Sequence, residues 1–206
     1  MKQTKSQTRR RPKRASVKVI KPNDQKFREL LLFIAERSEN DPQYGAIKLN
    51  KLLFYSDFLA YLKLGKPITG QEYFALRQGP APRYGTRIRE EMIAAGEIAL
   101  QKKERADRIQ TRTVALRPPN YKVFSSEEIA LVTQVLQDCR ASSGSELSEK
   151  SHKFAGWSLA KEKETIPYAV ALVGNRLPTH DEIQHGVILQ ATAEACLAEH
   201  AARGNA

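Results

Sequence analysis

Apolar residues recur at helical spacing in several stretches of the chain, and these stretches predict its main elements. The first helix is expected to begin at Asn23 or Asp24, both good N-cap residues, and to end near Ser38. Its apolar face is formed by Phe27, Leu30, Leu31 and Ile34. The residues 41–45 contain Asp-Pro and Gly, which indicate a loop after this helix.

The stretch from Ile47 to Leu64 is the most hydrophobic helix that the sequence predicts. Twelve of its eighteen residues are apolar, and at 100° per residue they leave no wide polar face. A helix that is hydrophobic on every side is normally buried, so we expect it at the centre of the domain. Gly65 and Pro67 should end it.

Asn50 and Asp57 are polar residues within this apolar helix, and their spacing of seven places them on nearly the same side. Because a buried carboxylate is costly without a partner, Asp57 is expected to be paired inside the protein. The candidate partners are Arg77, Arg83 and His152.

A second row on the same helix is formed by Lys48, Lys51 and Tyr55. This row is expected to line a rim that faces solvent or a partner. The simpler interpretation is a rim on which the lysine tips reach the solvent.

The middle of the chain predicts a small β element. A short strand is expected over 71–78, and the Gly-Pro-Ala-Pro sequence at 79–82 should break both strand and helix. A helix should then run from Pro82 or Arg83 to Ala95. The segments 97–101 and 111–117 predict a charged hairpin around a polar ten-residue connection.

The last third returns to helical patterns. A helix is expected to start at Ser125 or Ser126, a short one to cover 146–152, and another to cover 166–173, with Trp157 as a core anchor. Thr179 and Glu182 form a capping box for a helix to about residue 201. One stripe of this helix carries small and apolar residues, namely Ile183, Val187, Ala191, Ala195 and Ala198.

Together these patterns predict a mainly α fold, a compact helical domain around a buried central helix, with a short strand and a hairpin as its β element. The expected divisions are a basic tail at 1–21, the domain at 22–178, and a C-terminal helix at 179–206 that docks on the domain or faces a partner.

The charge of the chain is concentrated at its N-terminus. The 206 residues carry 34 Lys and Arg against 23 Asp and Glu, a formal net charge of +11. Residues 1–21 hold nine of the basic side chains and no acidic one, so this segment should be disordered when free. It is either a solvated tail or an arm for DNA or RNA, whose candidate contacts are Arg9, Arg10, Arg11, Lys13 and Arg14.

The sequence lacks the features that are typical of several protein classes. No apolar run approaches 18 residues, which argues against a membrane-spanning helix, and no hydrophobic segment follows the basic start, which argues against a secretory signal. Cys139 and Cys196 form no CxxC motif and suit a reducing cytoplasm. His180 and His185 are five apart, one residue too many for the HExxH zinc motif. We therefore expect no metal, no cofactor and no enzymatic activity, with His152 as a structural residue rather than a general base.

Four motifs in order resemble those of a known family. They are the IKLNKLLFYSDFL stretch at 47–59, the GKPITG turn at 65–70, the extended segment with a Gly-Pro corner at 73–82, and the Ser-His…Trp element at 151–157 followed by Ile-Pro. Their combination resembles the Panacea domain, the antitoxin domain that includes SocA. The resemblance covers roughly residues 25–175.

The resemblance implies a helical antitoxin that binds and suppresses a cognate toxin protein, by sequestration or as an adaptor for proteolysis. Its departures from the family pattern are Gln78, Ala81 and Ser151. The hairpin at 97–117 and the helix at 179–202 are the candidate toxin contacts. The candidate motif or partner-binding residues are Lys48, Lys51, Tyr55, Asp57, Gly79, Pro80, His152 and Trp157. The alternative function is a nucleic-acid-binding or transcriptional regulatory protein that acts through the basic tail.

Overall fold

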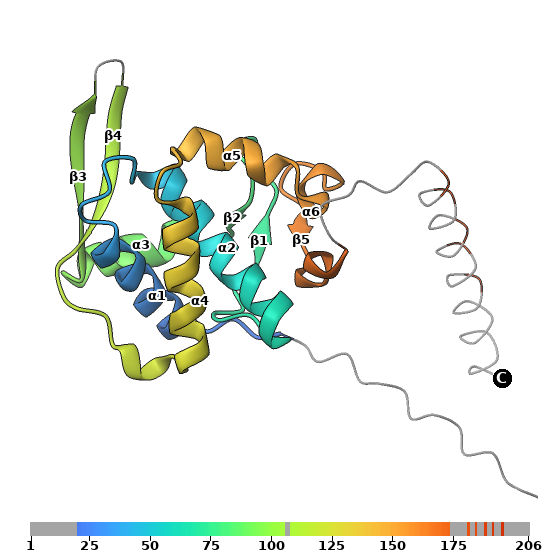
Figure 1. Cartoon of the computed structure of the whole chain (residues 1–206), viewed down its shortest axis with the longest axis horizontal. Coiled ribbons are helices and arrows are strands. Elements are labelled where there is room, and N and C mark those ends of the chain that lie inside the picture. The colour runs from blue at the N-terminus through green and yellow to red at the C-terminus, as the bar shows by residue number, and fades with distance from the viewer. Residues whose placement is uncertain are drawn as a thin grey trace, which may run out of the picture.

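The structure is a computed structural model that describes residues 20–105 and 108–173 and the single positions 181, 184, 188, 191 and 195. Within this part the chain is mainly helical with a small β element (Figure 1), as the sequence predicts. The helices are α1 (Asp24–Arg37), α2 (Ala46–Leu64), α3 (Gly85–Ala94), α4 (Ser126–Cys139), α5 (Gly144–His152) and α6 (Ala155–Ser158), with 3₁₀ turns η1 (Tyr121–Val123) and η2 (Tyr168–Leu172). The strands are β1 (Tyr73–Phe74), β2 (Ala81–Pro82), β3 (Ile98–Arg105), β4 (Arg108–Ala115) and β5 (Thr165–Ile166).

Helix α1 begins and ends where its capping residues predict. The Asn23 side chain accepts a hydrogen bond from the N–H of Lys26 at 2.9 Å, and Ser38 is the C-cap. Every residue from Glu29 to Ala35 is buried, so α1 contributes more than one face to the core.

Helix α2 carries buried side chains around most of its circumference, and it packs against α1, α4, α5 and η2. Gly65 ends it in the left-handed conformation, at φ +70°, and donates its N–H to the carbonyl of Tyr61. Buried on α2 are Leu49, Leu52, Leu53, Phe54, Phe58 and Ala60.

A three-stranded antiparallel sheet with the order β2-β1-β5 lies beside α2. The expected strand over 71–78 is wrong in extent, because β1 covers only Tyr73 and Phe74, and the backbone hydrogen bonds to neighbouring segments reach only to Glu72 and Ala75 on either side. The expected break at 79–82 is also wrong in part, since Ala81 and Pro82 form β2. Pro82 is tolerated because β2 is an edge strand, and the N–H of Arg83 continues the pairing.

The hairpin is longer than the sequence indicates. Strands β3 and β4 pair in one register from Ile98 opposite Ala115 to Arg105 opposite Arg108, so the predicted ten-residue polar connection is wrong. Its polar residues extend the ladder as a ribbon that projects past the helices in Figure 1. Residues such as Lys102 and Lys103 are exposed, which makes a charged strand compatible with solvent.

The two capping boxes of the C-terminal half position α4 and α5. Ser125 and Glu128 form one box, as predicted, and Ser143 and Glu146 form the other, which starts α5 at Gly144 rather than at 146. The helix expected over 166–173 is instead the strand β5 followed by η2. Because Thr165 and Ile166 pair with β1, the start of this segment is a strand, and only the residues of η2 are helical.

The buried apolar side chains form two clusters. The larger one joins α1, α2, α3 and α4. The smaller one is aromatic and lies where α2 meets β1 and η2, and its buried members are Phe54, Phe58, Tyr73, Ala75, Ile166 and Tyr168. Trp157 is only partly buried and packs against this second cluster.

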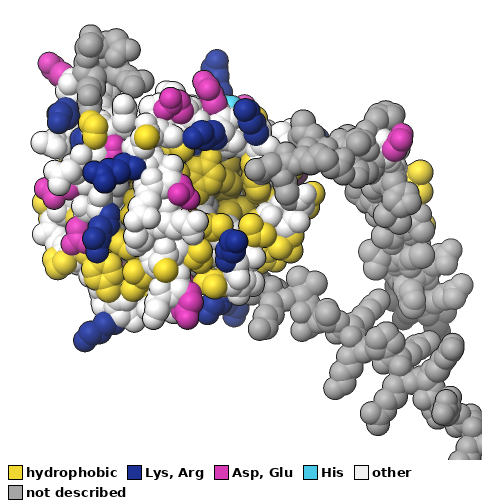
Figure 2. Space-filling model, viewed as in Figure 1, with side chains coloured by type: hydrophobic (Ala, Val, Ile, Leu, Met, Phe, Trp, Pro, Cys, Tyr) yellow, Lys and Arg dark blue, Asp and Glu magenta, His cyan; other side chains and the backbone are white. Residues whose placement is uncertain are grey.

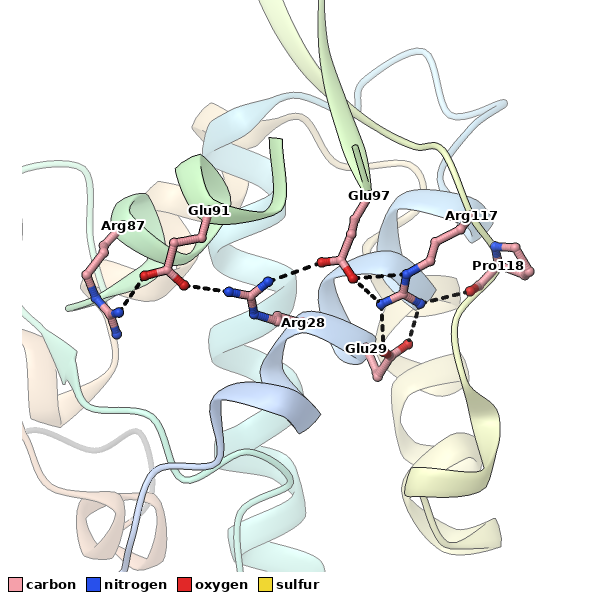
Figure 3. A network of polar contacts seen from close by, with 7 residues as sticks. All are labelled: Arg28, Glu29, Arg87, Glu91, Glu97, Arg117 and Pro118. Atoms are coloured by element: carbon pink, nitrogen blue, oxygen red, sulfur yellow. Dashed lines mark hydrogen bonds and ion pairs between the residues drawn. The ribbon is translucent and has the colours of Figure 1, made fainter. Parts of the chain in front are cut away.

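A network of ion pairs ties α1 to α3 and to the two residues that flank the hairpin at its open end, Glu97 and Arg117 (Figure 3). Arg117 contacts Glu29 at 2.8 Å and Glu97 at 2.7 Å, and Arg28 connects Glu97 to Glu91. Burial alone would raise the pKa of Glu29, but the hydrogen bonds from Arg117 and from a backbone N–H lower it below its ordinary value. The network therefore stabilises a carboxylate that is almost fully enclosed.

Two predicted segments lie wholly or largely outside the described residues. Of the basic tail at 1–21 only positions 20 and 21 are described. Of the C-terminal helix only Asp181, Gln184, Ile188, Ala191 and Ala195 are described, and all five are helical and exposed. In the described part, no helix combines the length and apolarity that crossing a membrane requires.

Candidate functional site

The loop between β1 and β2, residues 76–80, forms a sharp corner, and we call it the corner loop. Gly79 has φ +88°, and its N–H donates to the carbonyl of Leu76 at 2.8 Å. A Cβ atom at this position would lie 2.3 Å from the hydroxyl oxygen of Ser151 and 2.6 Å from the ammonium nitrogen of Lys51. Both the backbone conformation and the close packing therefore require glycine here.

Side chains from distant elements hold the carbonyl oxygens of the corner loop. Lys51 on α2 donates to Pro80 at 3.0 Å, and Ser148 on α5 donates to Gln78 at 2.5 Å. The indole N–H of Trp157 on α6 donates to Leu76 at 2.9 Å. Three helices thus converge on one turn of backbone.

His152 belongs to the same arrangement. Its ring is stacked on the indole of Trp157 with 3.8 Å between ring centroids, and it is hydrogen-bonded to the backbone of Arg77. Partial burial, followed by the charge of Lys51, lowers the pKa of His152 and so favours the neutral form of its ring. Its Nε2 atom is buried and has no hydrogen-bond partner among the described residues.

Lys51 and Lys48 do not form the solvent-facing rim that the helical wheel predicts. Lys51 is 2% exposed, and burial lowers its pKa to about 7. Lys48 is 1% exposed and forms an ion pair of 2.7 Å with Asp41. It also donates to the carbonyls of Arg140 and Ser142, which join α4 to α5.

Tyr55 completes this correction. Its hydroxyl donates to the carbonyl of Leu147 at 3.2 Å, and burial raises the pKa of the phenol. The row of Lys48, Lys51 and Tyr55 therefore anchors α2 to three separate backbone segments. It supports the shape of the domain and offers little side-chain surface to a partner.

Asp57 is fully buried, but the expected cationic partners are wrong. Its carboxylate accepts hydrogen bonds from the backbone N–H and hydroxyl of Thr69, at 2.7 and 2.5 Å, and from the Tyr73 hydroxyl at 2.9 Å. Burial raises the pKa of Asp57, while these hydrogen bonds oppose the shift. Arg83 instead pairs with Glu72, and His152 is held at the corner loop.

A hollow of about 310 Å³ adjoins the corner loop. Asn50 and Lys51 from α2 line it on one side, and Arg77, Gln78 and Gly79 line it on another. Of the polar residues singled out on α2, only Asn50 and Lys51 therefore border open space here.

Some contributors to this site were missed at the sequence level. Ser148 donates to the corner loop, and Ser151, whose hydroxyl donates to the carbonyl of Ser148, lies against Gly79. Together with His152, these residues have the spacing i, i+3 and i+4 on α5. The capping box at Ser143 and Glu146 fixes where α5 begins. From that start, the sequence is sufficient to place Ser148, Ser151 and His152 on one face of the helix. Thr69 and Tyr73 gave no comparable signal.

Other candidate residues do not join the site. The predicted nucleic-acid contacts Arg9, Arg10, Arg11, Lys13 and Arg14 lie outside the described residues, as do His180 and His185. Cys139 is buried, and its pKa is raised by that burial. Among the described side chains no group of three or more His, Cys, Asp and Glu could hold a metal ion. The absence of enzymatic activity stays a prediction.

The model of one protein family, described as antitoxin SocA-like, Panacea domain, matches residues 49–158. The chain belongs to this family. The matched region runs from α2 to the end of α6, so it contains Lys51, Asp57, the corner loop, His152 and Trp157. The motifs at 47–59, 73–82 and 151–157, which are separate in the sequence, meet at the corner loop. The turn at 65–70 instead contacts the first motif through the hydrogen bonds of Thr69 to Asp57. No curated protein and no solved structure matches the chain.

Proposed function

We propose that this chain is an antitoxin that neutralises a cognate toxin by direct protein–protein binding. The observation that carries the proposal is the family match over 49–158, whose motif residues build one shared structural unit around the corner loop. Because most of these side chains are internal, the unit preserves the fold and leaves toxin recognition to exposed elements.

The β3–β4 ribbon is the exposed element that best suits a protein partner. Leu100 is 52% exposed and Ile109 is 64% exposed. In the observed register, Leu100 pairs with Thr113 and Glu104 pairs with Ile109, so both apolar side chains belong to the same face. Exposed apolar residues on a projecting ribbon are suited to contact another polypeptide.

Co-expression tests this proposal. The toxin candidate is the product of the reading frame next to the gene for this chain, expressed from an inducible promoter. The wild-type chain should restore growth and co-purify with that protein. The double variant Leu100→Asp with Ile109→Asp should lose both effects, while Gln101→Asp with Lys103→Asp, on the other face of the ribbon, should retain them.

Two controls make the result decisive. Circular dichroism and the urea midpoint must show that both double variants are folded. A wild-type chain that neither rescues growth nor co-purifies with the neighbouring product would overturn the antitoxin proposal for this pair. Equal loss in both double variants would overturn the assignment of the Leu100 face.

The basic tail supports a second candidate function, binding of DNA or RNA. Nine basic and no acidic side chains in residues 1–21 would release counterions from a phosphate backbone. Changing Arg9, Arg10, Arg11, Lys13 and Arg14 to Gln in the full chain should weaken binding to a random-sequence DNA duplex and flatten its salt dependence. Unchanged affinity and slope would exclude the tail as the contact.

A further inference from the structure

An apolar groove of about 720 Å³ lies between α2, α4 and α5, away from the corner loop. Figure 2 shows hydrophobic side chains gathered in a hollow over these elements, bordered by basic and acidic side chains. Its lining includes Phe58, Leu59 and Leu62 from α2, Val135 from α4, Leu147 from α5, and Phe154. The edge of α2 is open, since Leu62 is 47% exposed.

The charged residues that line this groove are Lys150, Lys153 and Asp138. Their sum is one positive charge. An occupant with an apolar face and acidic flanks would therefore match both the lining and the rim.

The chain itself supplies such an occupant. Ala171 lines the groove, and the continuously described chain ends two residues later at Val173. Five residues then separate Val173 from the capping box at Thr179, which is a reach of roughly 20 Å when extended. The C-terminal segment, residues 179–201, is thus tethered at the wall of the groove.

The composition of this segment fits the groove. It contains four acidic residues and no Lys or Arg. At 100° per residue, six apolar side chains fall within an arc of about 140°. They are Ile183, Val187, Ile188, Ala191, Ala195 and Ala198.

We propose that residues 179–201 of the same chain dock as a helix in the groove between α2, α4 and α5. The docking covers apolar surface on both sides and brings the acidic flanks to Lys150 and Lys153. It buries a face that is exposed at Ile188, Ala191 and Ala195 in the structure described above. The docking requires no toxin, so it stands or falls separately from the proposed function.

Leu62 lines the groove and is 47% exposed, so a cysteine placed there is accessible to a reagent. In a full-length chain carrying Leu62→Cys, Cys139→Ser and Cys196→Ser, a second cysteine is placed on the apolar arc with Ala191→Cys, or with Ala195→Cys. The matched control is Ala193→Cys, which lies about 160° around the helix from position 191. Each protein is treated with a short bismaleimide at low concentration and examined by intact mass and peptide mapping.

The expected result is an intrachain crosslink to position 62 that forms at least several-fold faster from position 191 or 195 than from position 193. The double variant Lys150→Glu with Lys153→Glu should slow this reaction several-fold, whereas Lys161→Glu, outside the groove, should not. Crosslinked dimers alone would overturn the proposal in favour of a second copy as occupant. Equal rates at all three positions, or no crosslink in proteins that remain folded by circular dichroism, would also overturn it.

Discussion

The ammonium nitrogen of Lys51 lies 3.0 Å from the carbonyl oxygen of Pro80, so α2 is tied directly to the turn between β1 and β2. The lysine is 2% exposed, and its burial lowers the pKa to about 7. A hydrogen bond that holds the corner loop is therefore made by a group whose charged form is costly in the folded state.

We predict that Lys51 makes the stability of the protein depend on pH in the alkaline range. Between about pH 7 and pH 10 the unfolded chain keeps the lysine proton while the folded chain releases it, so the free energy of unfolding rises with pH. Lys51 alone should raise the free energy of unfolding by up to about 1.4 kcal/mol for each pH unit in this range. Urea unfolding of the wild type and of Lys51→Met across this range measures it.

The informative quantity is the difference between the two proteins, because other groups titrate in the same range. The wild type should gain stability relative to Lys51→Met as the pH rises. A constant difference would show that Lys51 keeps an ordinary pKa in the folded protein.

Gly79 should be far less replaceable than Gly65, although both have positive φ. Gly79→Ala adds a Cβ atom that overlaps Ser151 and Lys51, and we expect it to lower the free energy of unfolding by about 2–5 kcal/mol. A Cβ atom at Gly65 would meet no atom within 4 Å, so Gly65→Ala should cost about 1–2 kcal/mol for the backbone alone. Urea unfolding of both variants tests the comparison, and equal costs would contradict the packing argument.

The sequence predicts the ends of α1, α2 and α4 well because these depend on local chemistry. Asn23 and Ser125 accept hydrogen bonds from backbone N–H groups in the first turn of their helices. Gly65 adopts the left-handed conformation that ends α2. The helical wheel of α2 likewise predicts burial of its apolar positions. Here short-range patterns were sufficient.

The contacts of the polar residues on α2 were not predictable in the same way. Whether the tip of Lys51 reaches solvent depends on the corner loop, and for Lys48 it depends on the α4–α5 junction more than 90 residues away. Asp57 was expected to need a cation, but the neutral donors Thr69 and Tyr73 surround it instead. Motif order in the sequence also gave no indication that Trp157 and Lys51 hold the same loop.

Arg117 should contribute more to stability than Arg87, although both belong to the network in Figure 3. Arg117→Ala leaves the enclosed carboxylate of Glu29 without its ion pair, and we expect a loss of about 1–3 kcal/mol. Arg87 is 54% exposed and pairs with Glu91 one helical turn away, so Arg87→Ala should cost less than about 0.5 kcal/mol. Thermal and urea unfolding of the two variants would reveal any reversal of this order.

Asp57→Asn should change both the stability and its response to acid. The amide places N–H donors against the donors of Thr69 and Tyr73, so we expect a loss of about 1–3 kcal/mol at pH 7.

Because burial raises the pKa of Asp57, the folded wild type takes up a proton at higher pH than the unfolded chain does. The favourable contribution of the protonated carboxyl is complete below the unfolded pKa of about 3.9 and is lost as the pH rises through the folded pKa. The stability advantage of the wild type over Asp57→Asn should therefore grow as the pH falls from 7 toward 4 in urea titrations. An advantage that shrinks over this range would mean that the hydrogen bonds outweigh burial and that the folded pKa is lowered.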